Sequence, residues 1–158
     1  MQIQERKFFN KCRLLLEDAC NTQEEYLNLL DAFQFIDETP DDYGVVSLQE
    51  AMMSAETYHN IRKLILFPKE TIVVDCGCGN ALHQVFFNDC YKYIGIDSVD
   101  NFFPLSENAI LLKGTVEEIL PKIDDEGKRL VGVSVLCGMC FENVKDAMFK
   151  KFTKVINI

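Results

Sequence analysis

The sequence predicts an α/β fold: a doubly wound, mainly parallel sheet of about five strands, preceded by an N-terminal helical extension. Three observations predict it. From residue 71 onward, short β-branched runs alternate with helical segments, an order typical of parallel strands joined by crossover helices. Before residue 71, apolar residues recur every three or four positions, as on the buried face of a helix. The run "TIVVDCGCGN" passes from an apolar strand directly into a glycine loop.

Two helices are expected in the N-terminal extension. An apolar stripe marks the first of them: Phe8, Cys12, Leu15, Leu16 and Ala19. Thr22 and Glu25 stand at capping-box spacing where the second helix begins. The acidic, turn-rich segment "DETPDDYG" follows at residues 37–44. We therefore expect a helical extension or lid over residues 1–45 and an α/β domain over residues 46–158.

The α/β domain is predicted element by element from its caps and its apolar runs. Ser47 and Glu50 form a cap for a helix over residues 48–66, which Pro68 ends. Strands are expected over residues 71–75, 91–97, 109–114, 129–137 and 154–158. Helices are expected between them, over residues 81–89, 115–120 and 142–152. This order gives a parallel sheet covered on both faces.

Charge and composition limit the classes of function. The 158 residues are 48% apolar and carry a formal net charge of −9. So acidic a chain is poorly suited to a phosphate backbone, and nucleic acid is not an expected partner. No apolar run reaches the roughly eighteen residues of a membrane span, and the N-terminus lacks a signal-peptide core. We expect a cytoplasmic protein without a membrane segment.

The glycine loop admits more than one ligand. A dinucleotide site would follow the pattern G-x-G-x-x-G, but Leu82 stands where the third glycine is required. Asp75, just before the loop, would repel a pyrophosphate and suits a ligand with a cationic group. Asp97 ends the next strand, where a carboxylate can accept both hydroxyls of a ribose. The plainer alternatives are a helix-capping role for Asp75 and a solvated turn for Asp97.

A family resemblance rests on these same residues. "VVDCGCGNA" followed by "YIGID" resembles the class I S-adenosylmethionine-dependent methyltransferases, a Rossmann-like family. Asp75, Gly77 and Gly79 match the family's first motif, Ala81 stands at its third glycine, and Asp97 matches its ribose-binding acid. The resemblance covers residues 71–158. It implies that residues 46–158 are an S-adenosylmethionine-binding domain.

The later segments of the chain are similar to the same family. "LLKGTVEEILP" resembles the third strand and the loop that lines the adenine, and "VSVLCGMC" resembles the end of the fourth strand. The resemblance thus implies these cofactor-binding residues: Asp75, Cys76, Gly77, Gly79, Asp97, Ser98, Thr115, Val116 and Leu136. It implies no metal and points to no particular catalytic residue.

Two departures from the family stand out. Val131 and Gly132 occupy positions of the fourth strand where the family often carries an acid. The family's sheet also has seven strands, and only five are expected here. We expect the uncovered last strand to pair with a second copy in a homodimer, or to be covered by the N-terminal helices.

The cysteines and histidines offer further candidates. The chain has seven cysteines, and we expect reduced thiols. "CGC" at 76–78 and "CGMC" at 137–140 end strands expected to be neighbours, so four thiols could hold zinc, although packing or pocket-lining thiols are the preferred interpretation. Cys12, Cys20 and Cys90 are expected in the core. His59 and His83 are expected at the surface, and Tyr43 and His59 are candidate substrate contacts.

The sequence therefore predicts an S-adenosylmethionine-dependent methyltransferase acting on a small molecule or a protein. The alternative is a non-catalytic module with the same fold, which binds the nucleoside or a protein partner and transfers nothing. Methyl transfer requires chiefly proximity and alignment, so the absence of an assigned general base does not separate the two.

Overall fold

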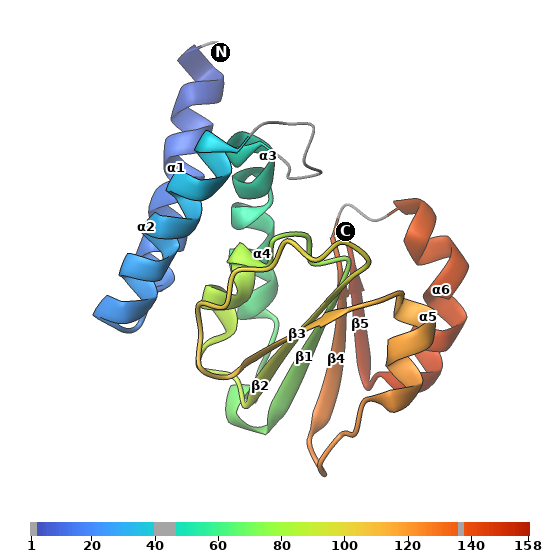
Figure 1. Cartoon of the computed structure of the whole chain (residues 1–158). Coiled ribbons are helices and arrows are strands. Elements are labelled where there is room, and N and C mark those ends of the chain that lie inside the picture. Colours follow the sequence, from blue (N-terminus) through green and yellow to red (C-terminus); the bar gives the residue numbers. More distant parts are fainter. Residues whose placement is uncertain (1–2, 40–46, 136–137) are drawn as a thin grey trace.

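A five-stranded parallel sheet forms the centre of the protein (Figure 1). The computed structural model describes residues 3–39, 47–135 and 138–158. The strands are β1 (Thr71–Cys76), β2 (Lys92–Asp97), β3 (Ala109–Lys113), β4 (Arg129–Ser134) and β5 (Lys154–Asn157). Their order in the sheet is β3-β2-β1-β4-β5, and every neighbouring pair is parallel. The predicted Rossmann-like, doubly wound fold is confirmed.

Successive side chains of the central strands face opposite sides of the sheet. Ile72 and Val74 pack in one apolar cluster, whereas Val73 packs in the other. All six residues of β1 are buried, because helices cover both faces of this middle strand. The edge strand β3 is only half-buried. The near-continuous apolar sequence of β1 is thus the pattern of a central parallel strand.

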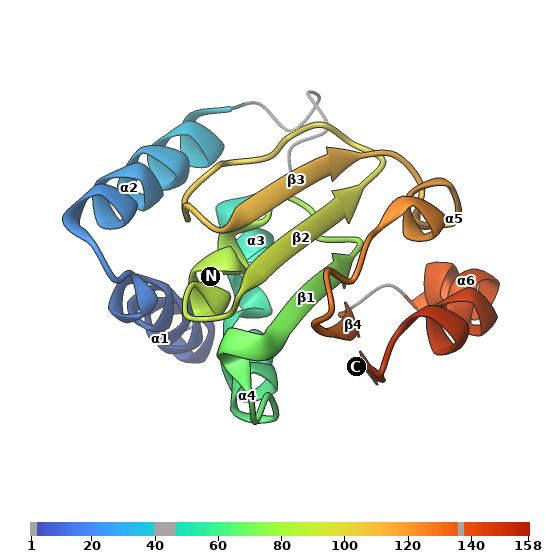
Figure 2. The same cartoon turned by 90° about the horizontal axis from the view of Figure 1, so that it is seen from below.

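The N-terminal helices cover one face of the sheet (Figures 1 and 2). They are α1 (Ile3–Ala19), α2 (Gln23–Glu38), α3 (Leu48–Met53) and α4 (Ala55–Lys63). Cys12 and Leu16 of α1 and Leu29 of α2 are buried in the same apolar cluster as Val73 of β1. The expected helical extension therefore shares one core with the sheet.

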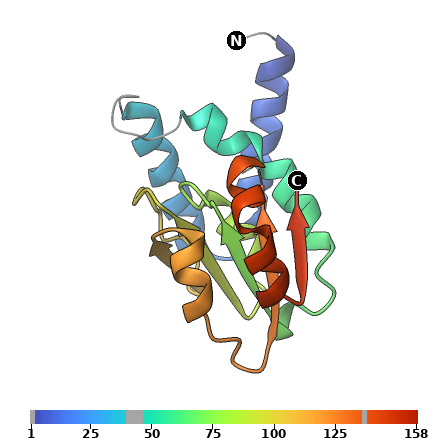
Figure 3. The same ribbon diagram turned by 90° about the vertical axis from the view of Figure 1, so that its right-hand side faces the viewer.

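Two helices cover the opposite face (Figure 3). The short α5 (Val116–Ile119) follows β3 and continues into a 3₁₀ turn, Leu120–Lys122, and α6 (Gly138–Lys151) joins β4 to β5. Met148 and Phe152 pack there against Ile72 and Val74. Gly132 of β4 lies under the Phe152 ring. No helix in the described parts of the chain is long and apolar enough to cross a membrane.

The predicted caps form as expected. The Thr22 hydroxyl accepts a hydrogen bond from the Glu25 N–H at 3.1 Å, and the Glu25 carboxylate accepts one from the Asn21 N–H at 2.8 Å. The Ser47 hydroxyl likewise accepts from the Glu50 N–H at 3.2 Å. These contacts satisfy N–H groups that have no partner within the first turn of a helix.

Three helix predictions were wrong in detail. The helix expected over residues 142–152 begins at Gly138, so the last three residues of "CGMC" belong to α6 and do not end the strand, which stops at Ser134. The single helix expected over residues 48–66 is broken at Ser54 into α3 and α4, and it ends at Lys63. The helix expected over residues 81–89 is a 3₁₀ helix, Leu82–Phe87, with all six side chains buried. Ala81 precedes it with a φ of 61°, so the chain enters this segment from the left-handed region. Most of the expected linker at residues 37–44 lies outside the described residues.

Candidate functional site

The loops after β1, β2 and β3 meet at the carboxyl edge of the sheet. The N–H groups of Gly77 and Cys78 donate to the Ile96 carbonyl at 2.8 and 3.0 Å. The Gly79 N–H donates to Oδ2 of Asp97 at 2.9 Å. The Gly114 N–H, after β3, donates to the Asp97 carbonyl at 2.9 Å. Asp97 therefore connects all three loops, in the place where doubly wound sheets bind their ligands.

The glycine loop needs left-handed backbone at alternate positions. Gly77 has a φ of 80° and Gly79 a φ of 58°, values at which a side chain would add strain. Ala81 adopts a φ of 61° at the third position of the pattern, although it carries a Cβ. A Cβ built on Gly79 meets no atom within 4 Å, so open space lies in front of this residue. The loop thus offers bare backbone to a ligand.

A cavity of about 220 Å³ lies between this loop and the N-terminal helices. Residues of the glycine loop, of the 3₁₀ helix after it and of α3 and α4 form its walls: Glu50, Ala51, Ser54, Tyr58, Gly77, Cys78, Gly79, Asn80, Ala81, Leu82 and His83, with Val135 after β4. Among the described residues of the lining, Glu50 alone has a formal charge. Asn80 is buried, and its Nδ2 has no hydrogen-bond partner among the described residues. The cavity therefore combines an unused amide donor with one carboxylate.

Asp75 lies beneath the cavity, within the core. Its Oδ1 accepts a hydrogen bond from the Tyr58 hydroxyl at 2.8 Å, and its Oδ2 accepts one from the Tyr93 hydroxyl at 2.6 Å. The carboxyl group is fully buried, and this desolvation raises its pKa to about 6 despite the two hydrogen bonds. It neither caps a helix nor lines the cavity. Any influence of Asp75 on a ligand passes through Tyr58, which does line it.

His83 is buried, and the prediction of a surface histidine at this position was wrong. Its ring stacks on Tyr58 with centroids 4.3 Å apart, and its Nε2 is 3.2 Å from the Ser54 hydroxyl. Burial lowers its pKa to about 3, so the imidazole is neutral at physiological pH. Its Nδ1 has no partner among the described residues. The apolar residues on both sides of it, in "ALHQVFF", were the signal that the whole segment is buried.

The two thiols of the loop lie on opposite faces of the sheet. Cys76 packs in the cluster beneath α5 and α6, whereas Cys78 packs on the other face, where its Sγ lies over Gly95. Burial raises the pKa of the Cys78 thiol, so the thiol is protonated. Of the described residues, no three acidic, histidine or cysteine side chains are close enough to hold a metal ion. Cys137, and the side chain of Cys140, lie outside them.

The remaining predicted site residues are dispersed along the carboxyl edge. Ser98 is exposed next to Asp97. Thr115 caps α5, because its hydroxyl accepts a hydrogen bond from the Glu118 N–H at 3.3 Å. Val116 is half-buried against the α5–α6 cluster. Leu136 and Tyr43 fall outside the described residues. His59 is half-buried on α4, with its ring 5.8 Å from that of Phe86, and it does not line the cavity.

Sequence reasoning missed the polar side chains that surround Asp75. Tyr93 lies two residues before Gly95, the residue paired with Asp75, so the two side chains share one face of the sheet. This register made Tyr93 predictable, once β1 and β2 are paired. Tyr58 and Ser54 come from α4 and the break before it, and no local pattern indicates which strand they reach.

Comparisons with known proteins give no further guide: no protein-family model, no curated protein and no solved structure matches the chain. The chemistry of the carboxyl edge is therefore the basis on which a function is proposed.

Proposed function

We propose that the protein binds S-adenosylmethionine at the carboxyl edge of its sheet and transfers the methyl group to a small molecule or a protein. The observation that carries the proposal is the contact between Asp97 and the glycine loop. This contact puts a carboxylate from the tip of β2 directly beside backbone that a ligand can approach. A nucleoside with a cationic sulfonium fits both features.

Asp97 keeps acceptor capacity for a ribose. Its Oδ2 accepts from the Gly79 N–H at 2.9 Å, and its Oδ1 accepts from the Val99 N–H at 3.0 Å. Each carboxylate oxygen has two lone pairs, so two acceptor positions stay available for the ribose hydroxyls. The half-buried position of Asp97 leaves these positions within reach of solvent and of a ligand.

The cavity beside the loop suits the amino-acid end of the ligand better than a phosphate. Its described lining contains the Glu50 carboxylate and no lysine or arginine, and its histidine is neutral. A pyrophosphate would meet a carboxylate there without a compensating cation, whereas an ammonium group would be attracted. This charge pattern favours S-adenosylmethionine over NAD, although both are bound by sheets of this strand order.

Methyl transfer requires few catalytic groups from the protein. The sulfonium is already a good leaving group, so alignment of the acceptor with the methyl group supplies most of the rate. The Nδ1 of His83 is neutral, faces no partner among the described residues and belongs to a side chain that lines the cavity. Because its pKa is lowered to about 3, this imidazole is a weak base, and the proposal rests on alignment of the acceptor and not on base catalysis.

Replacing the ribose acceptor should weaken the cofactor. We expect Asp97→Ala to reduce the affinity for S-adenosylmethionine by about tenfold or more, because hydrogen bonds to a charged group contribute roughly 1.5–3 kcal/mol each. The carboxylate is at the tip of a strand, so the fold should persist. Isothermal titration calorimetry on the folded variant measures the change.

Asp100→Ala is the matched control, since it removes an exposed acid three residues further along the same loop. It should leave the affinity nearly unchanged. Asp97→Asn keeps one acceptor oxygen for the loop. Its affinity for S-adenosylmethionine should lie between those of Asp97→Ala and Asp100→Ala. Equal affinities of wild type and a folded Asp97→Ala would remove the ribose role and the main support for the proposed cofactor.

Activity separates the enzyme from a binding module. Transfer of a labelled methyl group from S-adenosylmethionine to an acceptor supports the methyltransferase, whereas tight binding without transfer supports a module that only binds the nucleoside. For both alternatives we propose a cytoplasmic location.

We also propose that β5 pairs with β5 of a second copy, which would form a homodimer. Light scattering would then give twice the mass of one chain.

A further inference from the structure

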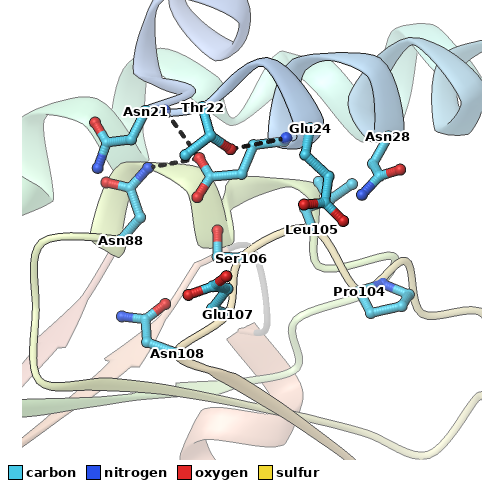
Figure 4. Close-up of a pocket in the computed structure, with 11 residues that line it drawn as sticks. Asn21, Thr22, Glu24, Asn28, Asn88, Pro104, Leu105, Ser106, Glu107 and Asn108 are labelled. Atoms are coloured by element: carbon cyan, nitrogen blue, oxygen red, sulfur yellow. Dashed lines mark hydrogen bonds between the residues drawn. The ribbon is translucent and has the colours of Figure 1, made fainter.

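A second cavity lies at the opposite end of the sheet from the glycine loop (Figure 4). Its volume is about 510 Å³. It is bounded by the start of α2 and by the chain just before β2 and β3, where Asn88 and Asn108 stand. The ligand sites of doubly wound sheets lie at the carboxyl ends of the strands, so this cavity is separate from the proposed cofactor site.

Acidic and amide side chains dominate its walls. Glu24, Glu25 and Glu107 line it, and no lysine, arginine or histidine is among the lining residues that the structure describes. The Glu25 carboxylate is committed to the protein, because its Oε2 accepts from the Asn21 N–H at 2.8 Å and from Asn88 Nδ2 at 3.1 Å. Glu24 and Glu107 are exposed and have no such role in the described structure. Their negative potential excludes anions and attracts a cation.

A buried hydroxyl in the wall lacks a partner. Ser106 is 7% exposed, and its Oγ forms no hydrogen bond within the described residues. Figure 4 shows this hydroxyl pointing from the loop before β3 toward α2. The Oδ1 of Asn108 is also without a partner there, although its Nδ2 donates to the carbonyls of Phe87 and Cys90. Both atoms can accept hydrogen bonds, and leaving them unpaired costs free energy that an N–H donor would recover.

An apolar hollow continues from this cavity along α2. It shares Asn28, Pro104 and Leu105 with the polar cavity, and its far end is formed by Phe35 and Phe103. The two rings meet edge to face with centroids 5.6 Å apart, and Phe35 is 54% exposed. An aromatic or aliphatic group bound there would cover this exposed ring.

A metal ion does not fit this arrangement. No three acidic side chains in the described parts of the chain converge closely enough to hold one. The cavity is also far larger than an ion, and it falls within the roughly 300–1,000 Å³ of small-molecule sites. The cation should therefore be an extended organic one.

We propose that these joined cavities bind a small amphipathic amine. Its ammonium group lies toward Glu24 and Glu107 and donates to the Ser106 hydroxyl, and its apolar group rests on Phe35 and Phe103. None of these residues lines the cavity beside the glycine loop, although the Phe103 N–H donates to the carbonyl of Asn80 in its wall at 3.2 Å.

Three probes of similar shape and different charge test the site: phenethylamine, which is cationic at neutral pH, 2-phenylethanol, which is neutral, and phenylacetate, an anion. Titration of the full chain is followed by the amide resonances of residues 21–28 and 105–108. We expect phenethylamine to bind with a Kd of about 1 mM, typical of a ligand this small. We expect 2-phenylethanol to bind at least about fivefold more weakly and phenylacetate not to bind. Equal binding of all three, or shifts confined to residues 77–81, would overturn the proposal.

Two variants test the named groups. Replacing both exposed carboxylates, as Glu24→Gln with Glu107→Gln, should weaken phenethylamine about fivefold, because two exposed ion pairs are lost. Ser106→Ala should weaken it too, yet should not lower the Tm, since it removes an unpaired buried hydroxyl. Glu117→Gln, on α5 at the other face, is the control and should change nothing. A Ser106→Ala variant with full affinity and a lower Tm would assign the hydroxyl a structural role and contradict the proposal.

Discussion

Asp75→Asn should gain stability relative to wild type as the pH rises, by about 2 kcal/mol between pH 4 and pH 7. Burial raises the pKa of Asp75 from 3.8 to about 6 in the folded protein. The folded state therefore keeps a proton that the unfolded state has lost. The stabilising contribution of this proton is complete below about pH 4 and disappears as the pH rises through 6. Asparagine does not titrate, so the variant escapes this loss.

Other titrating groups contribute equally to the stability of wild type and of Asp75→Asn, so their contributions cancel in the difference between the two proteins. His83, whose pKa is lowered to about 3, acts in the opposite direction, because the unfolded state gains a proton on it below about pH 6.5. This effect is present in both proteins and cancels in the difference. Urea unfolding at several pH values measures it. A difference in unfolding free energy that is constant from pH 4 to pH 7 would show that Asp75 does not change its protonation on folding in this range.

Gly132→Ala should destabilise the protein by about 3 kcal/mol. A Cβ on Gly132 would lie less than 3.0 Å from three carbons of the Phe152 ring. Phe152 is buried between α6 and the sheet and packs against Met148 in the same cluster, so it has little room to move. The methyl group would thus push α6 away from β4. Urea or thermal unfolding gives the loss directly.

A smaller side chain at position 152 should rescue the Gly132→Ala variant. In a background of Phe152→Leu, the additional cost of Gly132→Ala should fall well below its cost in the wild type, because the clashing ring carbons are absent. The double-mutant cycle isolates this coupling from the cost of Phe152→Leu itself. If the stability losses of Gly132→Ala and Phe152→Leu are additive, the loss caused by Gly132→Ala does not come from a clash with the Phe152 ring.

The fold was predictable because each strand is short, β-branched and separated from the next by a capped helix or turn. Thr115, for example, marks the start of α5 and caps it. Gly132 has a physical reason of its own: the strand has no side chain there because the Phe152 ring needs the space. The break at Ser54 was not predictable, since "LQEAMMSAETYHNIRKLIL" has an uninterrupted helical composition. Tertiary contacts of Ser54 with His83 accompany the break.

The candidate site was predictable at the backbone and less so at the side chains. Asp97 and the glycine loop are fixed by the ends of β1 and β2, and the structure brings them into contact. The surroundings of Asp75 depend on where α4 packs, which places the Tyr58 hydroxyl on its carboxylate. The acidic cavity near α2 combines segments some 80 residues apart, from Thr22 to Ser106, and no local pattern links them.

Calorimetric titration of the wild-type protein tests the central proposal most directly. S-adenosylmethionine and its demethylated product, S-adenosylhomocysteine, should each bind one site per chain with a saturable heat, and NAD should give none. Prior saturation with S-adenosylhomocysteine should abolish the heat of S-adenosylmethionine, because the proposal assigns both ligands to the loop beside Asp97. Binding of NAD without binding of either sulfur nucleoside would contradict the account.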